Sequence, residues 1–251
     1  MKLGLIIMAK EPMPGRVKTR LCPPYTPEEA AELCRCFLLD TFELAAMLQG
    51  VKVTIAYFPA KAGRTLKARV PPAFELMPQR GADLGERLSN AFEELFSLGY
   101  ERVVAIGADS PTLPPAYLDR SFELLARAEL VLGPSADGGY YLIGMKAPHP
   151  ELFQGVAMGT ERVFLETLER ARQANLRVSL LPPWYDVDTQ DDVKRLLAEL
   201  RATPGVARHT RAFLLSRGGP CVAGQGDMGV SLNPRWAKVS SDQRAASQEV
   251  S

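Results

Sequence analysis

Short apolar runs alternate along this chain with longer amphipathic stretches, and this alternation constrains the fold more than any other feature. Runs such as Val103–Ile106 are apolar at every position, which is typical of strands that are buried on both faces of a parallel sheet. The stretches between them space their apolar residues three and four apart, as helices do. The pattern predicts an α/β fold: a three-layer α/β/α sandwich with a mostly parallel central sheet.

The boundaries follow from the apolar runs and from helix-capping signals. Thr26 is a good N-cap residue and is followed by Pro27 and two acids, which predicts a helix from there to about Gln49. The predicted strands are 3–8, 52–58, 74–77, 102–107, 130–133, 140–145 and 178–181, and the further helices are 84–98, 115–128, 160–174 and 190–201.

Composition narrows the class of protein. With 251 residues, 46% of them hydrophobic, the chain suits one α/β domain, which we place at 1–217, followed by a polar tail at 218–251 that we expect to be disordered. Thirty basic and 29 acidic residues give no overall field for nucleic acid or for a membrane surface. The cysteines form no paired motif, and the apolar run Leu3–Ala9 is too short to span a membrane. We therefore expect a cytoplasmic protein with reduced thiols.

A basic loop follows the first predicted strand. Two prolines and Gly15 shape it, and it displays Arg16, Lys18 and Arg20 where open α/β sheets bind ligands, beyond the carboxyl end of a strand. The loop matches neither the Walker spacing nor the dinucleotide fingerprint. It is a candidate phosphate site, and a solvated basic turn is the alternative on spacing alone.

Acidic residues follow two later strands. Asp109 comes directly after 102–107, where a carboxylate can hold a hard cation, although a turn or cap role is the alternative. Asp186 and Asp188 alternate in an extended segment, so both can face a single cation, while Asp188 can also serve as an N-cap. Asp191 and Asp192 fall in the first turn of a helix, where acids are structural.

A pair of glycines joins the strands 130–133 and 140–145. Gly138 and Gly139 permit a close approach of substrate to the backbone, and Asp137 followed by glycine is equally a strong hairpin-turn signal. Both interpretations can hold at once. We assign neither histidine to catalysis, and we interpret the cysteines as packing residues.

Five ordered segments together resemble a known family. They are 9–21, 83–88, 107–111, 137–144 and 186–189. The chain resembles, over roughly residues 1 to 200, bacterial glycosyltransferase-like proteins of the GT-A nucleotide-diphospho-sugar transferase superfamily. Some members are linked to arsenosugar biosynthesis, and the fold is shared with molybdopterin and phospholactate nucleotidyltransferases. The chain departs from the family at Met158, where we expect a tryptophan, so the acceptor can differ.

The resemblance implies a role for each matched position. The nucleotide would be bound by Ala9, Lys10, Gly15, Arg16, Lys18, Gln79, Asp83 and Gly85. A Mg²⁺ or Mn²⁺ ion would be held by Asp109, Asp186 and Asp188, and the acceptor side would be lined by Asp137, Gly138 and Gly139. Arg16, Lys18 and Asp109 would carry the catalysis by stabilising charge on the leaving group.

The expected function is therefore a Mg²⁺-dependent transferase that moves a group from a nucleotide-activated donor to a small-molecule acceptor, first of all a nucleotide-sugar glycosyltransferase. The alternative is a guanylyltransferase-like nucleotidyltransferase that releases pyrophosphate, and the third hypothesis is a nucleotide-sensing module without turnover. Asp137 is the candidate general base. We expect neither nucleic acid nor membrane as a partner, and the sequence does not indicate an oligomeric state.

Overall fold

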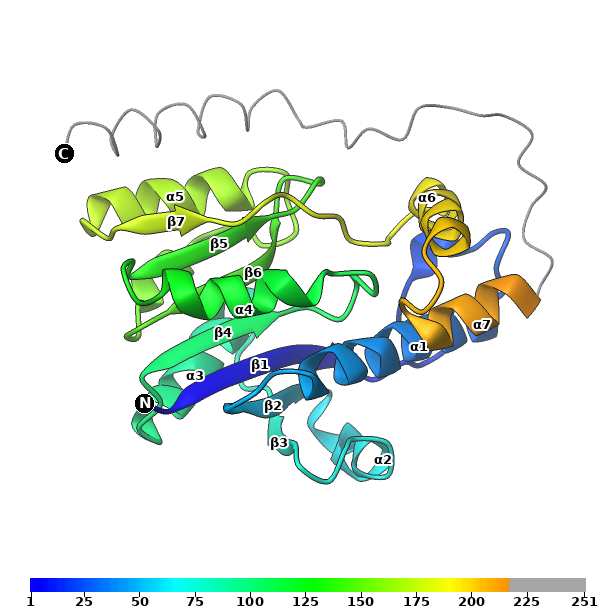
Figure 1. The fold of residues 1–251 in the computed structure, drawn as a ribbon, viewed down its shortest axis with the longest axis horizontal. Helices are drawn as coiled ribbons and strands as arrows, with labels where there is room; N and C mark the ends of the chain where they lie inside the picture. The colour runs from blue at the N-terminus through cyan, green and yellow to red at the C-terminus, as the bar shows by residue number, and fades with distance from the viewer. Residues whose placement is uncertain (217–251) are drawn as a thin grey trace. The chain divides into compact units, whose positions relative to one another are not determined.

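The computed structural model describes residues 1–216, and a seven-stranded sheet of order β3-β2-β1-β4-β6-β5-β7 forms its centre (Figure 1). The strands are β1 (Leu3–Lys10), β2 (Val51–Phe58), β3 (Glu75–Pro78), β4 (Arg102–Ile106), β5 (Leu130–Pro134), β6 (Tyr140–Met145) and β7 (Val178–Leu180). Every predicted strand is present, which confirms the predicted α/β class. The predicted tail at 218–251 lies outside the described residues.

Strand directions fix where the parallel strands end. β1 pairs in parallel with β2 and β4, β2 with β3, and β5 with β7. β6 runs antiparallel to both β4 and β5, so β5 and β6 form a hairpin. The carboxyl ends of β1, β4 and β7 therefore reach the same edge of the sheet.

Helices cover both faces of the sheet. They are α1 (Pro27–Ala46), α2 (Gly63–Lys67), α3 (Leu84–Ser97), α4 (Pro115–Leu124), α5 (Val163–Gln173), α6 (Gln190–Ala202) and α7 (Arg208–Ser216), with short 3₁₀ turns η1 (Thr19–Leu21), η2 (Ala60–Ala62) and η3 (Pro150–Leu152). Leu5 and Ile7 of β1 face a core shared with α1, α2 and α4. Gly4 faces the other side, where a Cβ would lie 2.8 Å from the Tyr100 ring and 3.0 Å from Leu95 of α3, so α3 packs closely on β1. α4 lies in front of the sheet and α3 behind it in Figure 1.

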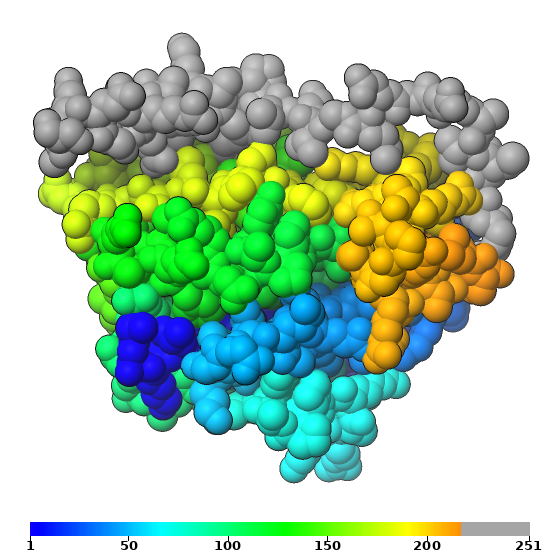
Figure 2. Space-filling model, viewed as in Figure 1, coloured from blue at the N-terminus to red at the C-terminus, as the bar shows by residue number. Residues whose placement is uncertain are grey.

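A second apolar cluster joins α1 to the C-terminal helices. It contains Phe37 of α1, Val187 in the segment before α6, Leu197 of α6 and Leu214 of α7. The space-filling view shows α6 and α7 (yellow to orange) lying against α1 (blue) (Figure 2). The structure thus adds α2 and α7, which the sequence did not predict.

Several helix ends differ from their predicted positions. α1 ends at Ala46 rather than near Gln49, α4 ends at Leu124, and α5 begins at Val163 rather than at 160. The residues just before α5, from Met158 to Arg162, form turns instead, and Gly159 among them has a φ of +84°. None of the described helices is long and apolar enough to cross a membrane.

Candidate functional site

Three segments meet at the carboxyl edge of the parallel strands: the loop after β1, the loop after β4, and the segment 184–189 that connects β7 to α6. The last of these crosses the sheet edge through backbone hydrogen bonds. Trp184 N donates to Pro134 O at 3.0 Å, and Val187 N donates to Asp109 O at 2.9 Å. These bonds bring Asp188 beside the end of β4, at the edge where open α/β sheets bind ligands.

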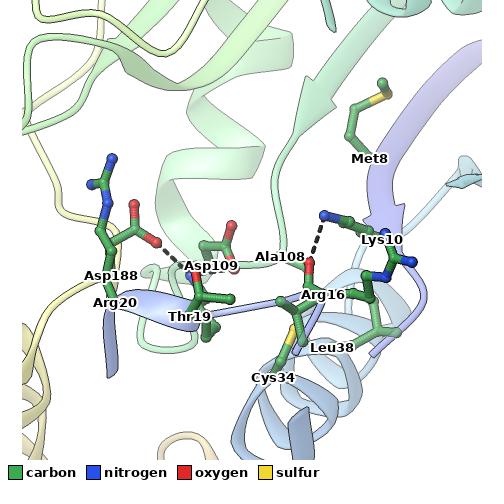
Figure 3. A pocket seen from close by; sticks show the side chains of 12 residues that line it. Met8, Lys10, Arg16, Thr19, Arg20, Cys34, Leu38, Ala108, Asp109 and Asp188 are labelled. Carbon is green, nitrogen blue, oxygen red and sulfur yellow. Dashed lines mark hydrogen bonds and ion pairs between the residues drawn. The ribbon is translucent and has the colours of Figure 1, made fainter. Parts of the chain in front are cut away.

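A cavity of about 310 Å³ opens between these segments and α1. Lys10 and Arg16 lie on one side of it, whereas Asp109 and Asp188 lie on the other (Figure 3). Its lining residues are Met8, Lys10, Arg16, Val17, Lys18, Thr19, Arg20, Cys34, Leu38, Ala108, Asp109 and Asp188. The structure therefore gathers the predicted basic loop and two of the predicted acids around one cavity.

Lys18 lies between the two acids. Its Nζ is 2.6 Å from Asp109 Oδ1 and 2.7 Å from Asp188 Oδ1, and its side chain is only 5% exposed. Burial alone would lower the pKa of Lys18, but the two carboxylates outweigh burial and raise it above its ordinary value. The backbone of Lys18 is left-handed, with φ +48° and ψ +36°, a conformation that is uncommon outside glycine and clusters at functional sites. The ammonium contacts acids, although the resemblance predicted that it would contact phosphate.

The other cations of the loop are open to the cavity. Arg16 is exposed, and Lys10 Nζ donates to the Arg16 carbonyl at 2.6 Å, which ties the end of β1 to the loop. Gly15 has a φ of +69°, so the turn that presents Arg16 needs a residue that adopts this region easily. Arg20 is exposed at the same cavity. Their phosphate-binding roles stay predictions.

Asp186 has partners of its own. Ser110 Oγ donates to its Oδ1 at 2.5 Å, and Ser135 Oγ donates to its Oδ2 at 3.1 Å. Burial raises the pKa of Asp186 to about 6, the Ser110 hydrogen bond opposes this rise, and the nearby charges of Asp109 and Asp137 add to it. The predicted pair thus divides in this structure: Asp188 faces Lys18, and Asp186 faces the two serines.

The raised pKa of Asp186 predicts a pH effect on stability. The folded state binds this proton more tightly than the unfolded chain does, so the contribution of Asp186 to stability falls as pH rises from about 4 to about 6. In EDTA, we expect the unfolding free energy of the wild type relative to Asp186→Asn to drop by on the order of 2 kcal/mol across this window. Urea titrations of both proteins measure it, and a difference independent of pH would contradict the assignment.

Three predicted nucleotide contacts lie away from the cavity lining and have structural partners. Gln79 Nε2 donates to Ala56 O at 2.7 Å and to Ala9 O at 3.3 Å, which ties together the ends of β1, β2 and β3. Asp83 is the N-cap of α3, and Gly85 is buried beneath the Phe153 carbonyl. Ala9 itself is 1% exposed, which leaves its backbone as the group for contact. Nucleotide binding by these residues stays a prediction.

The Gly138–Gly139 turn connects β5 to β6, as the hairpin interpretation predicted. Gly139 N donates to Asp137 Oδ1 at 3.0 Å, and Gly138 N donates to Ser135 O at 3.1 Å. The close approach at Gly138 comes from the protein: a Cβ there would lie 2.3 Å from the Glu161 carbonyl oxygen. The need for glycine at 138 is therefore explained by packing against the segment before α5.

Several residues that shape the site are not among the predicted site residues. Ser110 and Ser135 hold Asp186, and both lie in motifs that were recognised for their neighbours. Cys34 and Leu38, one helical turn apart on α1, form a wall of the cavity. Burial and the charge of Asp109 raise the pKa of the Cys34 thiol to about 12, which agrees with a packing role. The four-residue spacing of Cys34 and Leu38 on α1 was the sequence signal that could have placed both residues on one face of the helix.

Another cluster of possible metal ligands lies between α1 and α7. Among the described residues, Asp40, Glu43 and His209 each place one possible ligand atom within 4.8 Å of the others. Each already has partners: Asp40 accepts from the backbone amides of His209 and Thr210 at 2.9 Å, and His209 Nε2 lies 3.0 Å from Glu43. This cluster anchors α7 on α1.

Comparison with known proteins places the chain in a family. Residues 41–160 match the family described as "Uncharacterized protein conserved in bacteria (DUF2064)", a stretch that includes Asp109 and the 137–139 turn. A crystal structure from Desulfovibrio desulfuricans G20, provisionally named a nucleotide-diphospho-sugar transferase, is 34% identical with a TM-score of 0.81. That match covers 87% of this chain and 96% of the other. The chain therefore belongs to the same bacterial family as this relative. Its fold is that of the nucleotide-diphospho-sugar transferases and nucleotidyltransferases.

Two more distant proteins extend the comparison. The 2-phospho-L-lactate guanylyltransferase of Methanothermobacter thermautotrophicus is 25% identical over 202 residues, which are 78% of this chain and 83% of that protein. Molybdopterin-guanine dinucleotide biosynthesis protein A from Archaeoglobus fulgidus has a TM-score of 0.52 at 14% identity, covering 80% of this chain and 100% of the other, and shares the fold alone. Both the guanylyltransferase homologue and the relative with 34% identity are named as transferases.

Proposed function

We propose that the chain is a divalent-cation-dependent transferase that uses a nucleotide-activated donor. The observation that carries this proposal is the meeting of the basic loop after β1 with Asp109 and Asp188 around one cavity. An anionic ligand would lie against Lys10 and Arg16, with a hard cation between its phosphates and the two carboxylates. Such an arrangement is the usual way for α/β enzymes to bind nucleotide phosphates.

The two carboxylates fit a divalent cation. Their Oδ1 atoms already converge on one cation, the Lys18 ammonium, while their side chains stay 46% and 43% exposed. Carboxylate oxygens are the ligands that Mg²⁺ and Mn²⁺ prefer. Asp109 and Asp188 would hold the ion, with Asp186 as a third ligand only if it leaves Ser110 and Ser135. The bound ion would neutralise negative charge on the leaving phosphate group.

The remaining steps fall to side chains of the chain itself. Arg16, aided by Lys10 and Arg20, would orient the phosphates and stabilise charge that builds on the leaving group. The 137–139 turn would border the acceptor, because Asp137 is close enough to Asp186 to influence its pKa. Asp137 is exposed and remains the candidate general base for the acceptor hydroxyl or phosphate.

Within this class we place glycosyl transfer from a nucleotide sugar first. The relative with 34% identity bears a nucleotide-diphospho-sugar transferase name. A triphosphate donor carries more negative charge than a nucleotide sugar and would need more free cations, but the Lys18 charge is paired with acids inside the protein. The resemblance to proteins linked to arsenosugar biosynthesis offers one acceptor class for testing.

Nucleotidyl transfer is the second candidate, and the guanylyltransferase relative is the observation that favours it. In this reaction a phosphorylated acceptor attacks the α-phosphate of an NTP, the bond to the β-phosphate breaks, and pyrophosphate leaves. A non-catalytic nucleotide sensor is the third candidate and requires binding without turnover.

One pair of assays separates these candidates. The chain is incubated with Mg²⁺ and each of the four NTPs, with and without phosphorylated small acids, and pyrophosphate is measured. In parallel, UDP- and GDP-sugars are tested for release of free nucleoside diphosphate. We expect release of the nucleoside diphosphate from a nucleotide sugar. Pyrophosphate formed only with an acceptor phosphate would replace the glycosyl assignment by the nucleotidyl one, and binding without either product would favour the sensor.

A further inference from the structure

The buried ammonium of Lys18 raises the question of what it does in a site that binds a divalent cation. Its Nζ pairs with Oδ1 of Asp109 at 2.6 Å and with Oδ1 of Asp188 at 2.7 Å. Within residues 1–216, no hydrogen bond engages the Oδ2 atom of either acid, and the one bond from Lys18 to Asp188 ends on Oδ1. The ammonium is enclosed while both carboxylates remain nearly half exposed, so Lys18 approaches them from the protein side.

Lys18 is also held in place independently of the acids. Its left-handed backbone leads into η1, whose Leu21 is fully buried, and its Nζ lies 5.7 Å from the centre of the Phe37 ring on α1. Cation–π contacts of this kind stabilise a desolvated ammonium. A divalent cation can reach the exposed side of the carboxylates without displacing this side chain.

We propose that Lys18 is a positioning residue, the fixed inner cation of the metal site, which binds the inner oxygens of Asp109 and Asp188 and leaves their outer oxygens to the divalent ion. The proposal rests on the proposed function for its metal. Two carboxylates and one ammonium carry a net charge of −1, so the site attracts a free divalent cation only weakly. With the ion bound, the same site has a net charge of +1, which suits the phosphates of an incoming ligand. Metal and nucleotide therefore bind together rather than separately.

The first test measures Mn²⁺ binding without nucleotide, by electron paramagnetic resonance of the free ion. Lys18→Met removes the inner charge, and we expect Mn²⁺ affinity to rise by about tenfold or more, because a +1 charge close to a +2 ion is lost. Lys10→Met is the matched control: it removes a cation from the same cavity whose Nζ contacts a carbonyl, and its effect should stay below about threefold. Unchanged or weaker Mn²⁺ binding by Lys18→Met would overturn the proposal.

The second test uses the wild-type protein and does not depend on the variant's folding. Lysines are reductively methylated with and without Mn²⁺, and the modified sites are identified by mass spectrometry. We expect Lys18 to stay protected from methylation at the highest Mn²⁺ occupancy reached. If Lys18 instead became reactive, the metal would have displaced it from the carboxylates, which would overturn the proposal. Nucleotide binding is measured separately on the wild type. Its absence would sink the proposed function while leaving the Mn²⁺ effect of Lys18→Met intact.

Discussion

Replacing Asp109 with asparagine is expected to remove the Mg²⁺-dependent part of nucleotide binding, a loss of about 100-fold or more in affinity. The carboxylate lies directly after β4, faces the cavity and shares the Lys18 ammonium with Asp188. Asparagine has nearly the same shape but lacks the charge that a hard cation requires. Calorimetric titration with the best-binding nucleotide, with Mg²⁺ and with EDTA, measures the effect.

Asp191→Asn is the matched control for this change. Asp191 lies in the first turn of α6, three residues beyond Asp188, is 88% exposed and pairs with Lys194. We expect its nucleotide affinity to stay within about twofold of the wild type. Equal Mg²⁺-dependent binding by Asp109→Asn and by the wild type would remove Asp109 from the metal site.

Among the substitutions proposed for this chain, Gly138→Ala should cause the largest loss of stability, about 3 kcal/mol or more in the free energy of unfolding. Gly138 has a φ of +94°, and an added Cβ would lie 2.3 Å from Glu161 O and 2.7 Å from Glu161 C. These are backbone atoms, which cannot rotate away as a side chain can. Gly138 O also accepts the Phe164 amide at 3.1 Å, so a shift of the turn would disturb the start of α5.

The neighbouring glycine supplies the comparison. At Gly139 the nearest atom to an added Cβ is Asp137 Oδ1 at 3.3 Å, which belongs to an exposed side chain and can move. We expect Gly139→Ala to cost less than about 1 kcal/mol. Urea unfolding of the two variants measures the difference. Equal losses would show that the Glu161 contact does not control the conformation of the hairpin turn.

The sequence allowed the sheet to be predicted well because buried strands carry their own signal. Apolar runs such as Val103–Ile106 have few alternatives, and all the strands appear close to their predicted bounds. α7 was missed because its anchoring is tertiary. The carboxylate that accepts from its first amides belongs to Asp40, 169 residues earlier in the chain. No local pattern reports a capping group at that distance.

The candidate site was predictable in its location and less so in its contacts. The carboxyl ends of parallel strands must meet at one edge, which brought the basic loop, Asp109 and Asp188 together. The direction of Lys18 was not predictable, because a lysine in a basic loop can turn to solvent, to phosphate or to an acid 170 residues away. The alternation rule likewise placed Asp186 beside Asp188 but did not reveal that Ser110 and Ser135 hold it.

We propose, above all, that a nucleotide-activated donor and a divalent cation bind together at this cavity. The most direct measurement is thermal unfolding of the chain with a panel of nucleotides and nucleotide sugars, each with Mg²⁺ and with EDTA. A ligand at 100 times its Kd adds about 2.7 kcal/mol, which shifts a midpoint by several degrees. We predict that at least one ligand raises the midpoint in Mg²⁺ and loses most of this effect in EDTA. The absence of a shift with every ligand at millimolar concentration would show that no such ligand binds at this cavity.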